Sequence, residues 1–165
     1  MTTNFEFMQR PWNIPSFPVY SLATYLYEAI NMNICTYVTP VSMHPKLYCV
    51  AVYQNTKTMD WLNQSKEAVL QLLHADQYKL VRTLGQKSGF NYNKQQWLEK
   101  NLYLTQWKTL PVLENAAAYI HLQKISTFSS GGDHVLFVFK ALQYQSLSAN
   151  ILTTDILSKK KLIRI

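Results

Sequence analysis

The segment Gln54–Thr58 (QNTKT) contains the residue types that bind a phosphate group. It lies between a run typical of a strand, Leu47–Tyr53, and a short stretch typical of a helix, Thr58–Asn63. The first amides of a helix lack intrahelical acceptors, and the helix dipole favours an anion there. The segment adds an amide, two hydroxyls and an ammonium, from Asn55, Thr56, Thr58 and Lys57. On the residues alone, a phosphate site and a polar loop with a capping threonine are about equally favoured.

Two other segments could contribute to a binding site. The stretch Asn33–Ser42 (NICTYVTPVS) could place backbone polar groups and apolar cover along a flat ring such as a flavin, although composition alone favours an ordinary half-buried strand. His134 follows Gly131-Gly132-Asp133, where the chain is accessible, and could polarise a substrate or contact a nicotinamide. A single histidine at the start of a strand is more often a surface residue.

Other kinds of catalytic or binding site are not indicated. His44, His74 and His121 have no metal-ligand spacing, so no metal is expected. The sequence contains no GxSxG, HExxH, GxGxxG or P-loop motif, and its nine acidic residues suggest no catalytic pair. Cys35 and Cys49 are isolated within apolar segments, which favours reduced thiols in a cytoplasmic protein.

The elements that must position these residues are expected to be mainly strands. Eleven Tyr and seven Phe against four Gly favour pleated, half-buried surfaces. The hydrophobic patterns predict two helices, over Thr58–Asn63 (capped by Thr58 or Asp60) and Asp76–Leu84 (ended by Gly85), with helical turns near Gln95–Asn101 in an otherwise loop-like 86–107. They predict strands over Val19–Tyr27, Asn33–Ser42, Leu47–Tyr53, Ala68–Leu73, Ala118–Ser126 and His134–Leu142. Together these elements predict one domain over residues 1–165, an antiparallel β-barrel with a few peripheral helices.

The net charge of the chain limits the classes of binding partner that are expected. The formal net charge of +7 favours anionic partners, but the basic residues are spread along the chain, with one run at Lys159–Lys161. Nucleic acid is therefore not favoured, since no RNA-binding signature occurs. The start of the chain predicts no signal peptide, and no apolar window is long enough to predict a membrane span.

Five short motifs, taken in order, resemble the flavin-reductase-like family, which has the FMN-binding, Greek-key split-barrel fold. The motifs are Asn33–Val38, Val41–Lys46, Tyr53–Thr58, Leu84–Gly89 and Gly132–His134, and the resemblance extends over roughly Pro18 to Leu142, which is most of the chain. The resemblance implies a homodimer with FMN bound non-covalently near the subunit interface. In members that are reductases, it implies hydride transfer from NAD(P)H to the flavin.

The resemblance also implies roles for individual residues. The isoalloxazine and ribityl chain would meet Asn33, Cys35, Thr36, Tyr37 and Val38, and Ser42 belongs to the same cofactor-binding set. The phosphate would be held by Asn55, Thr56, Lys57 and Thr58. Ser88 and Gly89 would close over the cofactor, and His134 would stand near the nicotinamide.

The sequence departs from the family pattern in three places. The acidic-Pro-Pro motif reads His44-Pro45-Lys46, the Asp-Gly turn reads Glu28-Ala29, and the C-terminal segment that covers the flavin is replaced by Asn150–Ile165. The different C-terminal segment affects how a nicotinamide would reach the flavin. The sequence therefore predicts an NAD(P)H:flavin oxidoreductase that supplies reduced flavin, with an FMN-binding electron carrier or sensor as the alternative.

Overall fold

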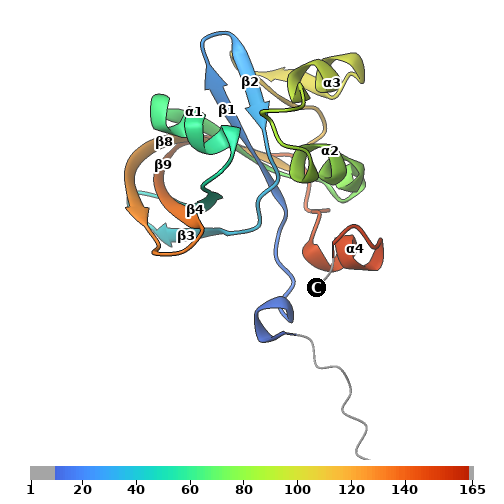
Figure 1. Cartoon of the computed structure of the whole chain (residues 1–165), viewed down its shortest axis with the longest axis horizontal. Helices are drawn as coiled ribbons and strands as arrows, with labels where there is room; N and C mark the ends of the chain where they lie inside the picture. Colours follow the sequence, from blue (N-terminus) through green and yellow to red (C-terminus); the bar gives the residue numbers. More distant parts are fainter. Residues whose placement is uncertain (1–9, 164–165) are drawn as a thin grey trace, which may run out of the picture.

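The computed structural model describes residues 10–163 and is dominated by a curved antiparallel sheet (Figure 1). Its seven strands run in the spatial order β2-β1-β5-β8-β9-β4-β3. Their bounds are β1 Tyr20–Leu26, β2 Ala29–Met32, β3 Val38–Ser42, β4 Leu47–Tyr53, β5 Glu67–Leu72, β8 Ala118–Ser129 and β9 His134–Ser146. A separate hairpin pairs β6 (Leu104–Trp107) with β7 (Leu110–Leu113).

Short helices lie around this sheet. The α-helices are α1 Lys57–Gln64, α2 Leu80–Gln86, α3 Lys94–Lys100 and α4 Thr154–Lys159, and the 3-10 helices are η1 Pro11–Asn13 and η2 Ala75–Lys79. Figure 1 shows α2 and α3 on the side of β2, with α4 near the C-terminal end. Within residues 10–163, no helix is long and apolar enough to cross a bilayer.

One connecting segment, rather than a strand ladder, links β1 to β4 on the open side of the sheet. Between β2 and β3 the chain crosses residues 33–37, where Cys35 exchanges two backbone hydrogen bonds of 2.9 Å with Tyr20 of β1. Two residues later, the carbonyl of Tyr37 accepts from the amide of Ala51 in β4, also at 2.9 Å. Segment 33–37 therefore spans the space between β1 and β4. The predicted antiparallel split barrel with few helices is confirmed.

Two apolar cores fix the strands because β1 and β5 are covered on both faces. Successive side chains of a strand point to opposite faces. Leu22 and Leu70 pack in the barrel interior with Phe137 and Phe139, whereas Ala23 and the neighbouring Val69 pack in the outer core with the helices. All of these residues are buried. This double burial explains why the apolar run in β5 shows no amphipathic period in the sequence.

Most of the predicted elements are present. The strands predicted at Leu47–Tyr53, Ala68–Leu73 and His134–Leu142 correspond to β4, β5 and β9, and the glycine-rich turn before His134 joins β8 to β9. The strand predicted over Asn33–Ser42 is wrong in its first half. The side-chain Oδ1 of Asn33 accepts from the backbone amide of Leu22 at 3.1 Å, and the chain crosses between strands instead of joining a ladder.

The helix predictions need three corrections. The side chain of Thr56 caps α1, not that of Thr58 or Asp60, because it accepts from the amide of Met59. The helix predicted over Asp76–Leu84 is split into η2 and α2. Gly85 lies inside α2 rather than ending it, and a Cβ there would lie 3.2 Å from the Cβ of Ile34 in the crossing segment. The β6–β7 hairpin and β2 were not predicted.

Candidate functional site

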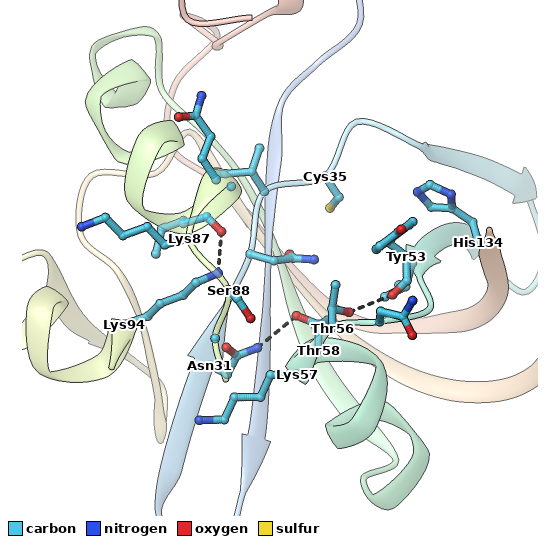
Figure 2. Close-up of a pocket in the computed structure, with 18 of the residues that line it drawn as sticks. Asn31, Cys35, Tyr53, Thr56, Lys57, Thr58, Lys87, Ser88, Lys94 and His134 are labelled. Carbon is cyan, nitrogen blue, oxygen red and sulfur yellow. Dashed lines mark hydrogen bonds between the residues drawn. The ribbon is translucent and has the colours of Figure 1, made fainter. Parts of the chain in front are cut away.

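A cleft of about 440 Å³ lies where the crossing segment 33–37 meets the N-terminus of α1 (Figure 2). Its other walls come from the end of β4, the end of α2 with the loop after it, and the first residue of β9. The structure brings into this one cleft the following predicted residues: Asn33, Cys35, Thr36, Tyr37, Asn55, Thr56, Lys57, Thr58, Ser88, Gly89 and His134. Asn33 and His134, which lie about a hundred positions apart in the sequence, therefore meet at one site.

Two predicted residues do not line this cleft. Val38 lines a neighbouring, more apolar groove of about 910 Å³ that shares Cys35 and Tyr37 with the cleft. Ser42 lies at the far end of β3, opposite Leu47, and lines neither space. It is carried away from the site because β3 runs away from segment 33–37 along β4.

The polar end of the cleft is built by the first turn of α1. The hydroxyl of Thr56 donates to the carbonyl of Tyr53 at 2.8 Å and accepts from the amide of Met59 at 3.2 Å, so its proton is already engaged. The hydroxyl of Thr58 accepts from the side-chain amide of Asn31 at 3.0 Å. A hydroxyl carries one donor and two acceptor positions, so this bond leaves the Thr58 proton available to a ligand.

Asn31 is a site residue that the sequence analysis missed. It lies on β2, is 3% exposed, and also places its side-chain nitrogen 3.4 Å from the hydroxyl of Thr24. Its Oδ1 comes so close to Gly89 that a Cβ there would lie 2.8 Å from it. The only signal in the sequence is a polar residue inside an apolar run, and this signal does not show which way the side chain faces.

A second missed residue, Lys94, brings a buried positive charge to the cleft. Lys94 is 6% exposed, and its ammonium donates to the carbonyls of Leu84 at 2.6 Å and Met32 at 3.2 Å. Burial, and secondly the charge of Lys57, lower the pKa of Lys94 from its ordinary value of 10.5 to about 8. A lysine at the first position of a helix usually lies on the surface, so its burial cannot be predicted from the local sequence.

The other two lysines of the cleft turn their ammonium groups away from it. The ammonium of Lys57 lies 4.8 Å from the ring centroid of Trp61, and Figure 2 shows its side chain leaving the cleft at the end marked by Asn31. The ammonium of Lys87 lies 3.9 Å from the ring centroid of Tyr92. Among the described residues that line the cleft none is acidic, so the site is electropositive.

The opposite end of the cleft is formed by the crossing segment and three rings. Burial raises the pKa of the Cys35 thiol to about 12, so this thiol stays protonated at neutral pH and is not a nucleophile. The ring centroid of His134 lies 5.3 Å from that of Tyr37 and 5.5 Å from that of Tyr53. These rings form an aromatic wall beside the crossing backbone.

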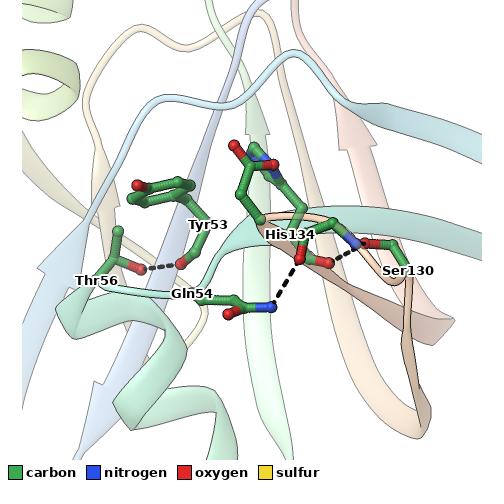
Figure 3. A network of polar contacts seen from close by, with 7 residues as sticks. Tyr53, Gln54, Thr56, Ser130 and His134 are labelled. Carbon is green, nitrogen blue, oxygen red and sulfur yellow. Dashed lines mark hydrogen bonds and ion pairs between the residues drawn. The ribbon is translucent and has the colours of Figure 1, made fainter.

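The imidazole of His134 is held in place by its neighbours. Its Nδ1 lies 2.6 Å from a carboxylate oxygen of Asp133. Because a carboxylate only accepts, Nδ1 carries the proton in this pair, which leaves Nε2 as the acceptor of the neutral ring. Figure 3 shows how the hairpin is tied to the loop after β4: the side chain of Gln54 donates to the carbonyl of Gly132 at 3.0 Å, and the hydroxyl of Ser130 donates to the carbonyl of His134.

The model of the flavin reductase like domain matches residues 17–153, which include every wall of the cleft. The chain belongs to the flavin reductase-like family. The resemblance inferred from the five sequence motifs is thus confirmed. No curated protein matches the chain by sequence.

Solved structures of flavin reductase-like proteins share this fold at low sequence identity. An FMN-binding protein from Thermus thermophilus with bound 1-cyclohex-2-enone has a TM-score of 0.73 and 22% identity, covering 88% of this chain and 80% of that one. The flavin reductase PheA2 has a TM-score of 0.70 and 23% identity, covering 84% of each chain. An NADH:FAD oxidoreductase from Streptomyces globisporus has a TM-score of 0.69 and 17% identity, covering 84% and 79%.

Proposed function

We propose that this chain binds FMN in the cleft and acts as an NAD(P)H:flavin oxidoreductase that supplies reduced flavin to another protein or acceptor. The observation that carries the proposal is the asymmetry of the cleft. One end holds the Thr58 hydroxyl at the N-terminus of α1 and the ammonium of Lys94 from α3, and the other holds aromatic rings beside a crossing backbone segment. FMN has the same asymmetry, with a phosphate dianion at one end and a flat ring at the other.

The polar end suits a phosphate because it offers donors and no competing anion. We assign the phosphate to the hydroxyl of Thr58, the first-turn amides of α1 and the ammonium of Lys94. Asn55 and Ser88 line the cleft beside them. Thr56 supports the site by capping the helix rather than by donating its proton. Gly89 suits the site because a side chain there would push against Asn31.

The other end suits the flavin ring. Asn33, Thr36 and Tyr37 line it, and the apolar groove next to it is exposed at Trp12 and Phe17, which are 67% and 40% exposed. We propose that a second copy of the chain covers this groove, which would bury the exposed rings and place FMN near a dimer interface. Sedimentation of the purified protein should then give twice the mass of one chain, whereas a monomer at micromolar concentration would refute the dimer.

The bound flavin supplies the hydride-accepting ring, so this chain needs to provide only binding, orientation and electrostatics. His134 and Tyr53 border the open side of the ring end, where a nicotinamide would have to approach. Asp133 acts on His134 as a positioning residue, because it fixes which ring nitrogen carries the proton. The Nε2 atom of His134 is then placed to accept a hydrogen bond from a carboxamide.

The test is reduction of the bound flavin without oxygen. Protein loaded with FMN is mixed with NADH or NADPH, and the bleaching of the oxidised flavin absorption is followed. The proposal predicts bleaching faster than for free FMN under the same conditions. His134→Asn, which keeps a polar side chain, should slow this bleaching by about tenfold to a hundredfold and leave FMN affinity within about twofold.

A second candidate function, an electron carrier or sensor without nicotinamide activity, is favoured by the C-terminal segment. Leu157 of α4 and Ile163 line the apolar groove beside the ring end, where they narrow the space around the flavin. Tight FMN binding combined with bleaching no faster than that of free flavin would favour this candidate. Failure to bind FMN would contradict both.

A further inference from the structure

A cavity of about 490 Å³ lies outside the cleft, between the start of α2 and the end of α4. It is lined by Tyr78, Lys79, Arg82, Lys160 and Leu162, and it shares none of these residues with the cleft. Its volume is within the range of about 300–1,000 Å³ that is typical of small-molecule sites. Tyr78 and Leu162 pack against the outer core, so they give the cavity a fixed apolar wall.

Three cationic side chains surround this cavity. Lys79 ends η2 and Arg82 lies three positions later in α2, so both project from the same side of one helical segment. Lys160 comes from the end of α4, and its ammonium lies 3.9 Å from the ring centroid of Tyr78. The ammonium of Lys79 lies 6.0 Å from the same centroid. One half-buried ring therefore holds two of the three cations at the cavity.

These positive charges are not neutralised by the protein. None of the three cations forms an ion pair within residues 10–163, and no acidic residue of that range lines the cavity. The acidic residues nearest in the sequence have other partners: Asp76 lies 3.5 Å from His74, and Asp155 lies 2.8 Å from Lys159. Like charges held around one cavity repel one another, and an anion bound between them would turn that repulsion into attraction.

We infer that this cavity binds a small anion that contains two linked phosphate groups. The guanidinium of Arg82 offers parallel N–H donors that fit phosphate oxygens, and the ammonium groups of Lys79 and Lys160 add compact charges. Two linked phosphates can reach cations on both sides of the cavity, whereas a single phosphate reaches fewer of them. The inference is independent of the proposed function, because the cavity and the cleft share no lining residue.

An anion held in this cavity would connect two segments of the chain. Arg82 belongs to α2 and Lys160 to the C-terminal segment, and both segments also line the apolar groove beside the ring end of the cleft. They are already joined by the side chain of Gln86, which donates to the carbonyl of Leu162 at 3.3 Å. The bound anion should therefore hold the C-terminal segment more firmly against α2.

The experiment is calorimetric titration of the whole protein with inorganic pyrophosphate, in excess FMN so that the phosphate end of the cleft is occupied. Pyrophosphate should bind about tenfold more tightly than orthophosphate. Arg82→Gln should weaken pyrophosphate binding by about tenfold, and Arg82→Lys, which keeps the charge, should weaken it less. Lys100→Gln is the matched control and should change little, because Lys100 is an exposed cation of α3 that lines neither the cavity nor the cleft.

Two further measurements complete the test. ADP that binds more tightly than pyrophosphate, with the same dependence on Arg82, would assign the linked phosphates to a nucleotide, whereas weaker or equal binding would assign them to inorganic pyrophosphate. Both results support the inference. Digestion with trypsin, followed by mass spectrometry, reports on the C-terminal segment. Pyrophosphate should slow cleavage at Lys159–Lys161 in the unmodified protein and not in Arg82→Gln.

Three results would overturn the inference. The first is the absence of pyrophosphate binding, and the second is binding that Arg82→Gln leaves unchanged or weakens no more than Lys100→Gln does. The third is citrate binding as tight as that of pyrophosphate, which would show that the cavity selects negative charge and not phosphate. None of these results bears on the proposed function. Failure to bind FMN would refute that function and leave the comparison of Arg82→Gln with Lys100→Gln as the test of this cavity.

Discussion

Lys94 places a buried ammonium group with a lowered pKa in the cleft. Its ammonium is held by two carbonyl oxygens, one from β2 and one from α2, away from solvent and near a second cation. An ammonium in such a place is costly to keep charged, because burial favours the neutral amine. A phosphate dianion at the polar end of the cleft would offset that cost. The pKa of Lys94 should therefore depend on whether a phosphate is bound.

The pH dependence of FMN affinity should follow from this environment. The pKa of Lys94 is about 8 in the free protein, and a bound phosphate should raise it. The complex then binds more protons than the free protein above pH 8, so FMN affinity should fall as the pH rises from 8 to 10. Each pKa unit gained on binding corresponds to about a tenfold change in affinity.

Riboflavin provides the control, because it has the same ring and no phosphate. Its dissociation constant should change little with pH, and in Lys94→Met the FMN constant should show the same flat profile. Equal pH dependence for FMN and riboflavin in the unmodified protein would show that Lys94 does not sense the phosphate.

The contribution of Lys94 to folding stability should rise with pH, whereas FMN affinity should fall. The native pKa of about 8 is below the ordinary value of 10.5, so the unfolded state binds more protons between these two values. The free energy of unfolding of the ligand-free protein therefore gains a contribution from Lys94 as the pH rises from 8 to 10.5. Lys94→Met should remove that contribution, which denaturant titrations at pH 7.5 and 10 would measure.

A side chain at position 89 should disturb the cleft, because Gly89 packs closely against Asn31. A Cβ at this position would lie 2.8 Å from Oδ1 of Asn31, and Asn31 is buried and bonded to Thr58. Gly89→Ala should displace that pair, lowering FMN affinity about tenfold and the free energy of unfolding by roughly 1–3 kcal/mol. Gly132→Ala is the control, because its Cβ would meet only the Ser130 hydroxyl at 3.6 Å. Unchanged FMN affinity in Gly89→Ala would contradict the assigned role of the Asn31–Thr58 pair.

At the scale of elements, helix α1 links the barrel to the site. Thr56 caps it and at the same time ties it to the last residue of β4 through the carbonyl of Tyr53. Thr56→Ala should lower the free energy of unfolding by about 1 kcal/mol and weaken FMN binding, because the first-turn amides would lose their fixed direction. Thr56→Ser keeps the capping hydroxyl and should preserve both. Thermal denaturation with and without FMN measures the two effects.

Some elements of the fold can be predicted from the local sequence, and others cannot. Strands β4 and β9 and helix α1 follow from hydrophobic patterns and turn residues, which are local properties. The crossing of segment 33–37 does not, because it depends on Tyr20 and Ala51, which come from other strands. The composition of this segment is that of a strand, and only the tertiary pairing of Cys35 with Tyr20 turns it into the bridge that lines the cleft.

The same distinction holds for the site residues. That the residues around Thr58 line one cleft was predictable, because a strand-to-helix loop with donors is a local pattern. The direction of the Lys57 ammonium was not, because it depends on the ring of Trp61.

Lys94 and Asn31 were not predictable, because their surroundings come from other parts of the chain. Lys94 bonds to the carbonyl of Leu84 in α2. Asn31 bonds to side chains of β1 and α1. Ser42 was included because it ends the stretch Asn33–Ser42, but the direction of β3 places it outside both the cleft and the apolar groove.

At the scale of the whole molecule, the split barrel brings three separate chain regions to one opening. Strands β4 and β9 pair so that Tyr53 faces His134, α1 begins immediately after β4, and the end of α2 packs against the crossing segment at Gly85. The interior core around Leu70 and Phe137 holds these regions together from within. The fold thus explains the asymmetry of the cleft.

The structure of the protein crystallised with FMN tests the central claim most directly. The account predicts phosphate oxygens within about 2.7–3.2 Å of the Thr58 hydroxyl and the Lys94 ammonium, with the flavin ring lying along residues 33–37. Flavin bound elsewhere, or a phosphate that contacts neither Thr58 nor Lys94, would contradict the account.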